Sequence, residues 1–338
     1  MNLKQFAARL GLSPTTVSRA LSGYPEVKAA TRERVLKAAA LYGYRPNTSA
    51  LGLATGRVGA IGIVFKGDTE FGPHTSEFMG GLGTRLQRDE IDMLVVTVGS
   101  AEAEFAAYRR LAASKRVDGI VLHSPVVEDP RIPLLEELGL PFVIHGRATA
   151  EGRHGWLDID NAGAIRQATG LLADLGHRRI GFINGVRGRT FAEHRLEGYV
   201  DVLTEREIAL DPQLCGNGEF TDEMGFRLMQ GFLDLDDPPT AVLAGSMMSA
   251  LGAMRAIRIA GLRVGDDISL IAHDDVFPYL SPENLVPTLS TTRSPIRAAG
   301  ARIGDLILDL VQGGDGHTLR EVWPVELVMR HSTAACPR

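Results

Sequence analysis

The sequence contains little of what secreted, membrane-spanning or metal-dependent proteins need. Its 338 residues include two cysteines, Cys215 and Cys336, which are too few for a disulfide framework or a cysteine metal site. No apolar run approaches the roughly 18 residues that cross a bilayer, and the first residues lack the apolar core of a secretory signal peptide. We therefore expect a cytoplasmic protein with reduced thiols, no metal and no contact with a membrane.

The signatures of common enzymes are also absent. There is no Gly-x-Ser-x-Gly elbow, no phosphate-binding Gly-x-x-x-x-Gly-Lys-Ser/Thr loop and no His-Glu-x-x-His metal pair. Residues 216–218 (Gly-Asn-Gly) fail the dinucleotide pattern because Thr221 stands where a third glycine is needed. Residues 158–161 (Asp-Ile-Asp-Asn) resemble the start of a calcium loop without its later Gly and Glu, and we interpret them as a subdomain crossover with a helix N-cap. We expect neither enzyme activity nor a cofactor.

Aromatic residues are scarce, at 6% of the chain, whereas glycine is frequent, with 38 residues. This combination favours aliphatic cores and many turns, as in repeated strand-turn-helix units. The hydrophobic and charged contents, 44% and 23%, are those of a globular protein, and the length exceeds one domain of roughly 100–200 residues. We expect more than one domain.

Charge is divided unevenly along the chain. Residues 1–59 hold nine Lys or Arg and two Asp or Glu, a net charge of +7, whereas the rest hold 27 and 39, a net charge of −12. The overall charge of −5 therefore hides a basic module that suits a polyanion and an acidic body with another role.

The basic module has the pattern of three short helices. Apolar residues at i, i+3, i+4 and i+7 predict a helix over Leu3–Leu10, and Ser13 as N-cap with Pro14 at the first helical position predicts a second over Pro14–Leu21. A third helix is predicted over Ala30–Tyr42, and its inward residues are Val35, Ala38, Ala39 and Tyr42. Two short helices joined by a tight turn and followed by a third are typical of a helix-turn-helix unit.

In such a unit the second helix enters the DNA major groove with its N-terminus first. Small hydroxyl side chains allow close approach and bond phosphates or base edges, and an arginine reaches a guanine or a phosphate. The residues at this end are Pro14, Thr15, Thr16, Ser18 and Arg19. A three-helix protein-binding module with a solvated Thr-Thr-Ser face is the alternative.

The residues of this N-terminal stretch are more specific than the spacing of its apolar positions. Residues 7–22, 31–35 and 44–47 read AARLGLSPTTVSRALS, TRERV and YRPN, and they resemble the headpiece of the lactose-repressor family (LacI/GalR type). The resemblance continues over essentially the whole chain. It implies base contacts from Thr15, Thr16 and Arg19, and phosphate contacts from Ser18, Thr31 and Tyr44.

Residues 46–57 connect the headpiece to the body. Residues 47–56 could form a helix of about two turns, too short to be stable alone in water. The resemblance implies that this hinge helix pairs with that of a second chain in the minor groove, where Leu53 and Ala54 wedge a base step. Gly52 lowers the helix propensity by roughly 1 kcal/mol relative to Ala, so we expect folding of the hinge to depend on DNA. A plain linker with Leu53 packed on the body is the alternative.

From residue 58 onward, short aliphatic runs alternate with helical stretches, which is typical of parallel sheets covered by helices. The first series predicts strands at Val58–Phe65, Met93–Val98, Gly119–Leu122 and Pro141–Ile144, with helices near Thr75–Arg88, Ala103–Lys115 and Ile132–Leu138. The second predicts strands at Ile180–Asn184, Ala241–Leu243 and Ile268–Ala272, with helices near Ala162–Leu175, Ala192–Glu205, Asp222–Leu233 and Met248–Ile259.

The predicted fold is an N-terminal all-α helix-turn-helix headpiece followed by an α/β core of two doubly wound subdomains, like that of periplasmic binding proteins. We place the headpiece at residues 1–45, the hinge at 46–57 and the core at 58–338. The first subdomain is expected at 58–160 plus 293–322, and the second at 161–292 plus 323–338.

Parallel sheets bind ligands at the carboxyl ends of their strands, so two facing subdomains create a cleft. The candidates for contact with a small-molecule effector there are His123, His145, Arg147, Arg189, Arg195, Phe220, Ser246 and Asp274. The resemblance implies effector contacts from Arg195 and Asp274, with Phe220 stacking on the effector. A carboxylate and a guanidinium can bracket vicinal hydroxyls while an aromatic face packs on a ring, which suits a sugar.

Several candidates also have a purely structural interpretation. Arg195 could form only a salt bridge, Asp274 could cap a turn, and Phe220 could belong to the core. His145 could be a hydrogen-bonded histidine at a strand end, which leaves Arg147 the stronger candidate of that pair. Many family members carry an Asn-Asp pair where this chain has Ser246 and an apolar residue, so we expect a larger or differently oriented ligand, such as an oligosaccharide or glucoside. The loop at residues 66–74 is expected to cover the cleft.

These features predict a DNA-binding transcriptional repressor that binds a palindromic operator as a homodimer and is controlled by a sugar or glucoside. One alternative is a cytoplasmic sugar-binding protein or sugar-processing enzyme with the same core fold. Another is a corepressor-dependent repressor with a purine-type ligand. No heptad-patterned tail follows residues 325–331, so a tetramer built on a C-terminal helix is not expected.

Overall fold

The computed structural model describes residues 1–21, 24–44, 57–67, 71–148, 152, 154–273 and 277–337. The chain forms two compact units, Met1–Gly59 and Ala60–Arg338. The predicted hinge helix with Leu53 and Ala54, and the candidate effector residue Asp274, lie outside the described residues. None of the described helices is long and apolar enough to cross a membrane.

The described residues of the N-terminal unit form three helices around a small core. They are α1 (Leu3–Leu10), α2 (Pro14–Leu21) and α3 (Ala29–Tyr42), which confirms the three predicted helices to within one residue. The Ser13 hydroxyl accepts a hydrogen bond from the Thr16 backbone N at 3.1 Å, as predicted for an N-cap. The fully buried side chains are Phe6, Ala7, Val17, Ala20 and Val35.

The prediction that Tyr42 faces this core is wrong. Its side chain is 45% exposed, and the Arg9 guanidinium lies over its ring at 5.0 Å. Gly43, in the left-handed region at φ 60°, ends α3 and turns the chain, so that Tyr44 stacks on Phe6 with ring centroids 4.2 Å apart. Tyr44 therefore takes the core position that the helical spacing assigned to Tyr42.

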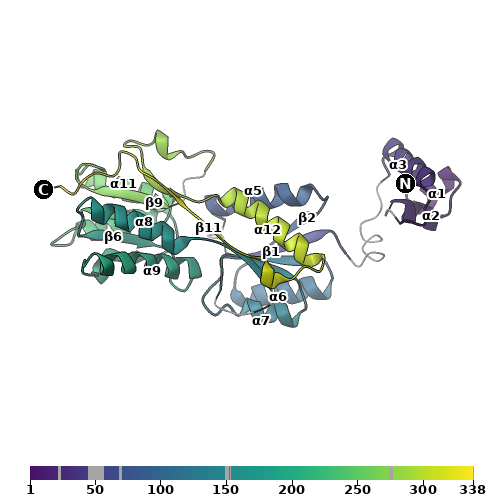
Figure 1. Ribbon diagram of the computed structural model, residues 1–338, viewed down its shortest axis with the longest axis horizontal. Coiled ribbons are helices and arrows are strands. Elements are labelled where there is room, and N and C mark those ends of the chain that lie inside the picture. The colour runs from purple at the N-terminus through teal and green to yellow at the C-terminus, as the bar shows by residue number, and fades with distance from the viewer. Residues whose placement is uncertain are drawn as a thin grey trace. The chain divides into compact units, whose positions relative to one another are not determined.

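The described residues of the C-terminal unit form two six-stranded sheets (Figure 1). The first has the order β11-β5-β4-β3-β1-β2, and all its pairs are parallel. Its strands are β1 (Ala60–Lys66), β2 (Asp92–Val98), β3 (Gly119–His123), β4 (Phe142–His145), β5 (Gly155–Ile159) and β11 (Arg320–Trp323). With α5 (Pro73–Gln87), α6 (Ala101–Ala113), α7 (Arg131–Glu137) and α12 (Ile296–Val311) it forms what we call the first half.

The second sheet has the order β12-β10-β9-β8-β6-β7 and is parallel except for the β10–β12 pair. Its strands are β6 (Ile180–Asn184), β7 (Cys215–Asn217), β8 (Ala241–Ala244), β9 (Ser269–His273), β10 (Ser290–Arg293) and β12 (Glu326–Val328). The second half is this sheet with α8 (Asn161–Asp174), α9 (Thr190–Glu205), α10 (Asp222–Leu233) and α11 (Met247–Ile259). Three single-turn 3-10 helices occur at Pro212–Leu214, Pro282–Asn284 and Gly316–Thr318 of the described chain.

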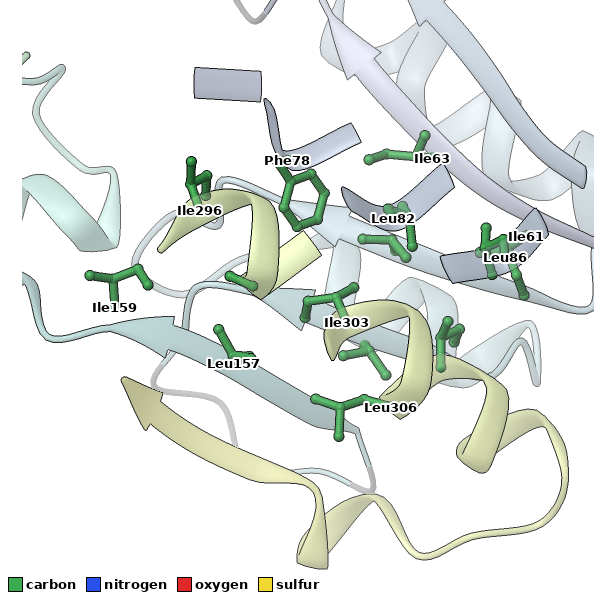
Figure 2. Close-up of a cluster of buried hydrophobic side chains, with 14 of the residues drawn as sticks. Ile61, Ile63, Phe78, Leu82, Leu86, Leu157, Ile159, Ile296, Ile303 and Leu306 are labelled. Atoms are coloured by element: carbon green, nitrogen blue, oxygen red, sulfur yellow. The ribbon is translucent and has the colours of Figure 1, made fainter. Parts of the chain in front are cut away.

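Helices cover both faces of each sheet because the buried strands are apolar on both sides. In β1, Ile61 and Ile63 pack in the cluster under α5 and α12, whereas Val64 packs in the cluster under α6 and α7. Figure 2 shows the first of these clusters, in which side chains of α5 and α12 gather against those of β1 and β5. This three-layer arrangement confirms the predicted α/β architecture.

The predicted strands and helices of the body all occur, with ends shifted by up to a few residues. No prediction covers β5, β7, β10 to β12 or α12, for two physical reasons. The strands have three to five residues and include polar or charged side chains, as in β10 (Ser-Thr-Thr-Arg), so they lack an aliphatic run. Helix α12 contains Gly300 and Gly304, which weaken its intrinsic propensity while its packing on α5 stabilises it.

Short crossovers join the two halves along the described chain. The chain passes from β5 to α8, from β10 to α12 and from β11 to β12, with no more than two residues between the elements. Segments that are separated in the sequence therefore complete each half, and α12 lies beside α5 in Figure 1.

The close crossing of α5 and α12 generates a prediction about stability. An alanine at position 81 would place its Cβ 1.9 Å from the Arg297 carbonyl oxygen, so Gly81→Ala should lower the free energy of unfolding by about 1–3 kcal/mol. Gly83→Ala on the same helix meets only a Met93 methyl at 3.7 Å, and should be neutral or stabilising by up to about 1 kcal/mol. Urea unfolding of both variants measures the difference. Equal stabilities would contradict the close helix contact.

Candidate functional site

A cavity of about 370 Å³ lies between the two halves of the C-terminal unit. The residues that line it come mainly from the carboxyl ends of strands in both sheets, where the alternation of strands and helices predicts a ligand cleft. From the first half they are residues 71–75, 123–125, 145, 146, 158 and 159; from the second half they are residues 161, 186, 189–191, 195, 218–221, 246, 248 and 277.

The cavity brings together most of the predicted effector residues. His123, His145, Arg189, Arg195, Phe220 and Ser246 all line it. Arg147 does not line it and instead contacts a residue that does, Asp158. Residues 71–74 of the predicted covering loop line the cavity, while residues 68–70 lie outside the described part of the chain.

His123 and His145 form a buried pair at the ends of β3 and β4. Their Nδ1 atoms are 2.9 Å apart, and Phe78 stacks on the His145 ring at 4.1 Å. Burial lowers the pKa of His123 to about 3 and that of His145 well below its ordinary value, so both rings are neutral near pH 7. One Nδ1 therefore donates and the other accepts, which leaves one Nε2 as an acceptor and the other as a donor. Such a pair suits a hydroxyl, which both donates and accepts.

Arg195 on α9 is 4% exposed, and hydrogen bonds hold its guanidinium in place. Its Nε donates to Asn161 Oδ1 at 2.8 Å and its Nη1 donates to the Gly245 carbonyl at 2.9 Å. The guanidinium also lies 5.0 Å from the Phe191 ring and 5.7 Å from the Phe220 ring. A planar cation beside two aromatic faces can bind ligand oxygens while the rings contact apolar ligand atoms.

Phe220 and Ser246 have structural roles in addition to lining the cavity. Phe220 is partly buried and packs against the hydrophobic core of the second half, close to Phe191 at 5.9 Å between ring centroids. The Ser246 hydroxyl caps α11 by accepting from the Ser249 backbone N at 3.1 Å. Because the Ser246 hydroxyl already bonds the end of the helix, it has less hydrogen-bonding capacity for a ligand than a longer polar side chain would have.

Arg189 joins the two halves at the edge of the cavity. Its Nη1 donates to the Ser124 carbonyl, after β3, at 2.6 Å. Next to it, Val127 N donates to the Gly188 carbonyl at 3.0 Å and Thr190 N donates to the Pro125 carbonyl at 3.1 Å. These bonds connect loops of different halves, so any change in the angle between the halves must strain or break them.

Asp158 and Asn161 are among the cavity-lining residues that are absent from the predicted set. The sequence interpretation of residues 158–161 as a crossover with an N-cap is confirmed, since Asp160 caps α8 by accepting from Gly163 N at 2.9 Å. Because β5 is not predicted, the position of Asp158 at a strand end could not be recognised. Burial raises the pKa of Asp158 to about 6, although the nearby Arg147 guanidinium opposes this rise.

The N-terminal unit presents the other predicted surface. Pro14, Thr15 and Arg19 are exposed at the start and along the outer side of α2. Thr16 and Ser18 are partly buried, and the Thr16 hydroxyl is 2.8 Å from the Ser13 hydroxyl. Thr31 is partly buried in the first turn of α3, and the Tyr44 ring is 8% exposed on the core. Thr15 and Arg19 are therefore the most accessible polar groups of the predicted recognition helix.

Both parts of the chain match families of known proteins. Residues 2–47 match the family described as bacterial regulatory proteins, lacI family, and residues 169–333 match the periplasmic binding protein-like domain. The chain is 47% identical to the HTH-type transcriptional regulator AglR of Rhizobium meliloti (strain 1021) over 340 residues, covering 100% of this chain and 95% of AglR.

Solved structures give the same result. The complex of the transcriptional regulator CelR with cellobiose matches with a TM-score of 0.74 at 30% identity, covering 98% of this chain and 99% of CelR. The Lac repressor dimer bound to operator and the anti-inducer ONPF matches with a TM-score of 0.84 at 28% identity, covering 99% of each chain. The resemblance and fold class predicted from the sequence are confirmed, and the relatives are regulators, not enzymes. The chain therefore belongs to the LacI family of bacterial transcriptional regulators.

Proposed function

We propose that this regulator is a repressor that binds a palindromic operator as a homodimer and responds to a neutral glucoside of disaccharide size. Residues 1–45 would bind DNA, residues 46–57 would form the hinge, and residues 58–338 would bind the effector and dimerise. Within the core, residues 58–160 plus 293–322 and residues 161–292 plus 323–338 would be the two subdomains. Binding of chromosomal DNA would place the protein in the cytoplasm.

The charge balance of the cavity is the observation that carries the effector proposal. The cavity is lined by two guanidinium groups, Arg189 and Arg195, and two carboxyl groups, Asp158 and Glu219, besides the neutral pair His123 and His145. A ligand with a net charge would leave one set of these groups uncompensated, and this is costly for Arg195 and Asp158, which are buried. A neutral ligand with many hydroxyls can bond to all of them.

The apolar part of the cavity suits the carbon faces of sugar rings. Phe71, Phe191, Phe220 and Phe277 line it, and aromatic faces pack on C–H groups. Its volume of about 370 Å³ falls in the lower part of the roughly 300–1,000 Å³ range of small-molecule sites. The structure of CelR contains cellobiose, a glucoside with two rings, which supports this ligand class for a relative of the same fold.

The DNA-binding part of the proposal rests on the exposed edge of α2 in a module of charge +7. Lac repressor, a relative by structure, was solved as a dimer on its operator, which supports dimeric binding to a two-fold site. Thr15, Thr16 and Arg19 would contact bases, while Pro14, Ser18, Thr31 and Tyr44 would support approach to the backbone. Leu53 and Ala54 would act in the minor groove.

Operator binding provides the first test. Arg19→Ala should weaken binding to a DNA fragment from upstream of the protein's own gene by about 5- to 150-fold, because a base-contacting arginine is worth about 1–3 kcal/mol. Lys37→Ala removes the same charge from an exposed ion pair with Glu33 on α3, and should cost only a few-fold. Fluorescence anisotropy at fixed salt measures both. Equal losses would indicate nonspecific electrostatic binding. If the wild type did not bind at low salt, the claim that it regulates through this DNA fragment would be rejected.

Thermal unfolding in the presence of ligands tests the effector class. Cellobiose or maltose at 100 times its Kd should raise the unfolding midpoint of the wild type by about 5 °C, whereas glucose should do less at the same concentration. The shift should disappear in Arg195→Ala and in Phe220→Ala, and persist in Phe105→Ala, which changes a partly buried Phe that does not line the cavity. A shift with adenosine but with no sugar would favour the purine-type corepressor instead.

A further inference from the structure

Three buried polar atoms converge beside the effector cavity and make no hydrogen bond. They are Arg147 Nε, Asp158 Oδ2 and His194 Nδ1, three of the six such side-chain atoms in the part of the chain that the structure describes. Asp158 Oδ2 is 3.1 Å from Arg147 Nε and 3.7 Å from His194 Nδ1. Unsatisfied buried groups are costly, so a natural protein that keeps three together requires a physical explanation.

These three residues belong to different halves of the core. Arg147 follows β4 and Asp158 lies in β5, both in the first half, whereas His194 lies on α9 in the second half. Asp158 stands next to the crossover from β5 to α8. The Asp158 carboxylate is therefore a place where polar side chains of the two halves meet.

The other oxygen of Asp158 connects to the ligand cavity. Asp158 Oδ1 accepts from Asn161 Nδ2 at 3.2 Å, and Asn161 Oδ1 accepts from Arg195 Nε at 2.8 Å. Arg195 in turn donates to the Gly245 carbonyl at 2.9 Å. A continuous chain of polar contacts thus runs from the second-half strand end, through the cavity arginine and the first residue of α8, to the first-half carboxylate.

Asp158 has fewer bonding partners than the buried carboxylates around Arg131, which form an ion network in the same half. Arg131 is buried with Asp129 and Glu104, and its guanidinium donates to both carboxylates at 2.6–3.2 Å, all within that half. Asp158 is 4% exposed but has one close cation, whose side chain is 35% exposed, and a histidine that is too distant to bond. The first network is satisfied and rigid, whereas the second has an uncompensated desolvation cost.

A small movement of α9 would change this balance. His194 and Arg195 are consecutive residues on that helix, so they move together. Bringing His194 Nδ1 into hydrogen-bond range of Asp158 requires a shift of roughly half an ångström. A ligand that pulls on Arg195 would therefore alter the Asp158–His194 contact, and movement of one half relative to the other would alter the position of Arg195.

We propose that Asp158 is a positioning residue that couples the effector cavity to the relative placement of the two halves, with Arg147 as its charge partner. This inference rests on the proposed function, because the halves must transmit their placement to DNA binding. In this proposal Arg147 forms an ion pair with Asp158 and does not contact the effector. The proposal also accounts for the missing hydrogen bond between Asp158 Oδ2 and His194 Nδ1, because that distance is set by the placement of one half against the other.

Asp158→Asn tests the proposal without any ligand. The amide keeps the shape and the acceptor for Asn161, but removes the buried charge and allows a neutral contact with His194. In the full-length protein it should change the Kd for the upstream DNA fragment by at least fivefold. His194→Gln should also change this Kd. The fold-change in the double variant should differ at least threefold from the product of the two single fold-changes, because one contact cannot be lost twice.

Glu104→Gln is the matched control. It neutralises a buried carboxylate that bonds an arginine and the Tyr108 hydroxyl entirely within the first half, so it should lower the unfolding midpoint without changing the DNA Kd by more than twofold. A DNA Kd for Asp158→Asn within twofold of the wild type, or strictly additive effects with His194→Gln, would overturn the proposal. Failure of the wild type to bind DNA would instead count against the proposed function.

Discussion

The short crossovers between the two halves are the constraint on which the site depends. With no more than two residues between the elements they join, the halves can rotate against each other but cannot separate far. The strand ends of both sheets consequently face one cavity, and no single half supplies a complete binding site. A ligand that contacts both halves must then favour one angle between them, which is the physical basis for linking a small molecule to DNA affinity.

Polar groups in and around this cavity fall into two classes that have different consequences. The His123–His145 pair, Arg195 and the Ser246 cap have partners and fixed orientations, so they present a preorganised surface to the ligand. Asp158 is buried, its neighbours Arg147 and His194 are partly buried, and the atoms that these three side chains turn to one another lack hydrogen bonds. The bonds of Arg189 to the first half can break on rotation. The rigid set determines which ligand binds, whereas the incompletely bonded set can respond to it.

The sequence predicts those elements whose formation is decided locally or by a continuous apolar run. Helix α2 begins and ends as predicted because Ser13 and Pro14 fix its start, and β6 occurs as predicted because its aliphatic run is buried on both faces. The strand-end rule also placed six candidate residues, from His123 to Ser246, around one cavity, although their roles as ligand contacts stay predictions.

What the sequence did not predict depends on contacts between distant segments. Helix α12 completes a half that begins more than 200 residues earlier, and its glycines are explained only by the close approach of α5. Tyr42 and Tyr44 exchange roles because Gly43 turns the chain, and Arg147 points to Asp158 because an unpredicted strand places that carboxylate beside it. Helical spacing and strand order alone carry none of this information.

The central claim is that ligand binding in the cavity and DNA binding by the headpiece share one conformational equilibrium. The most direct measurement is the affinity of the sugar that raises the unfolding midpoint, determined by titration calorimetry for the free protein and for its complex with the upstream DNA fragment. Reciprocal linkage predicts that the ratio of these two sugar affinities equals the ratio of DNA affinities measured with and without saturating sugar, about 5- to 150-fold for a typical coupling of 1–3 kcal/mol. Identical sugar affinities on and off DNA would contradict the account.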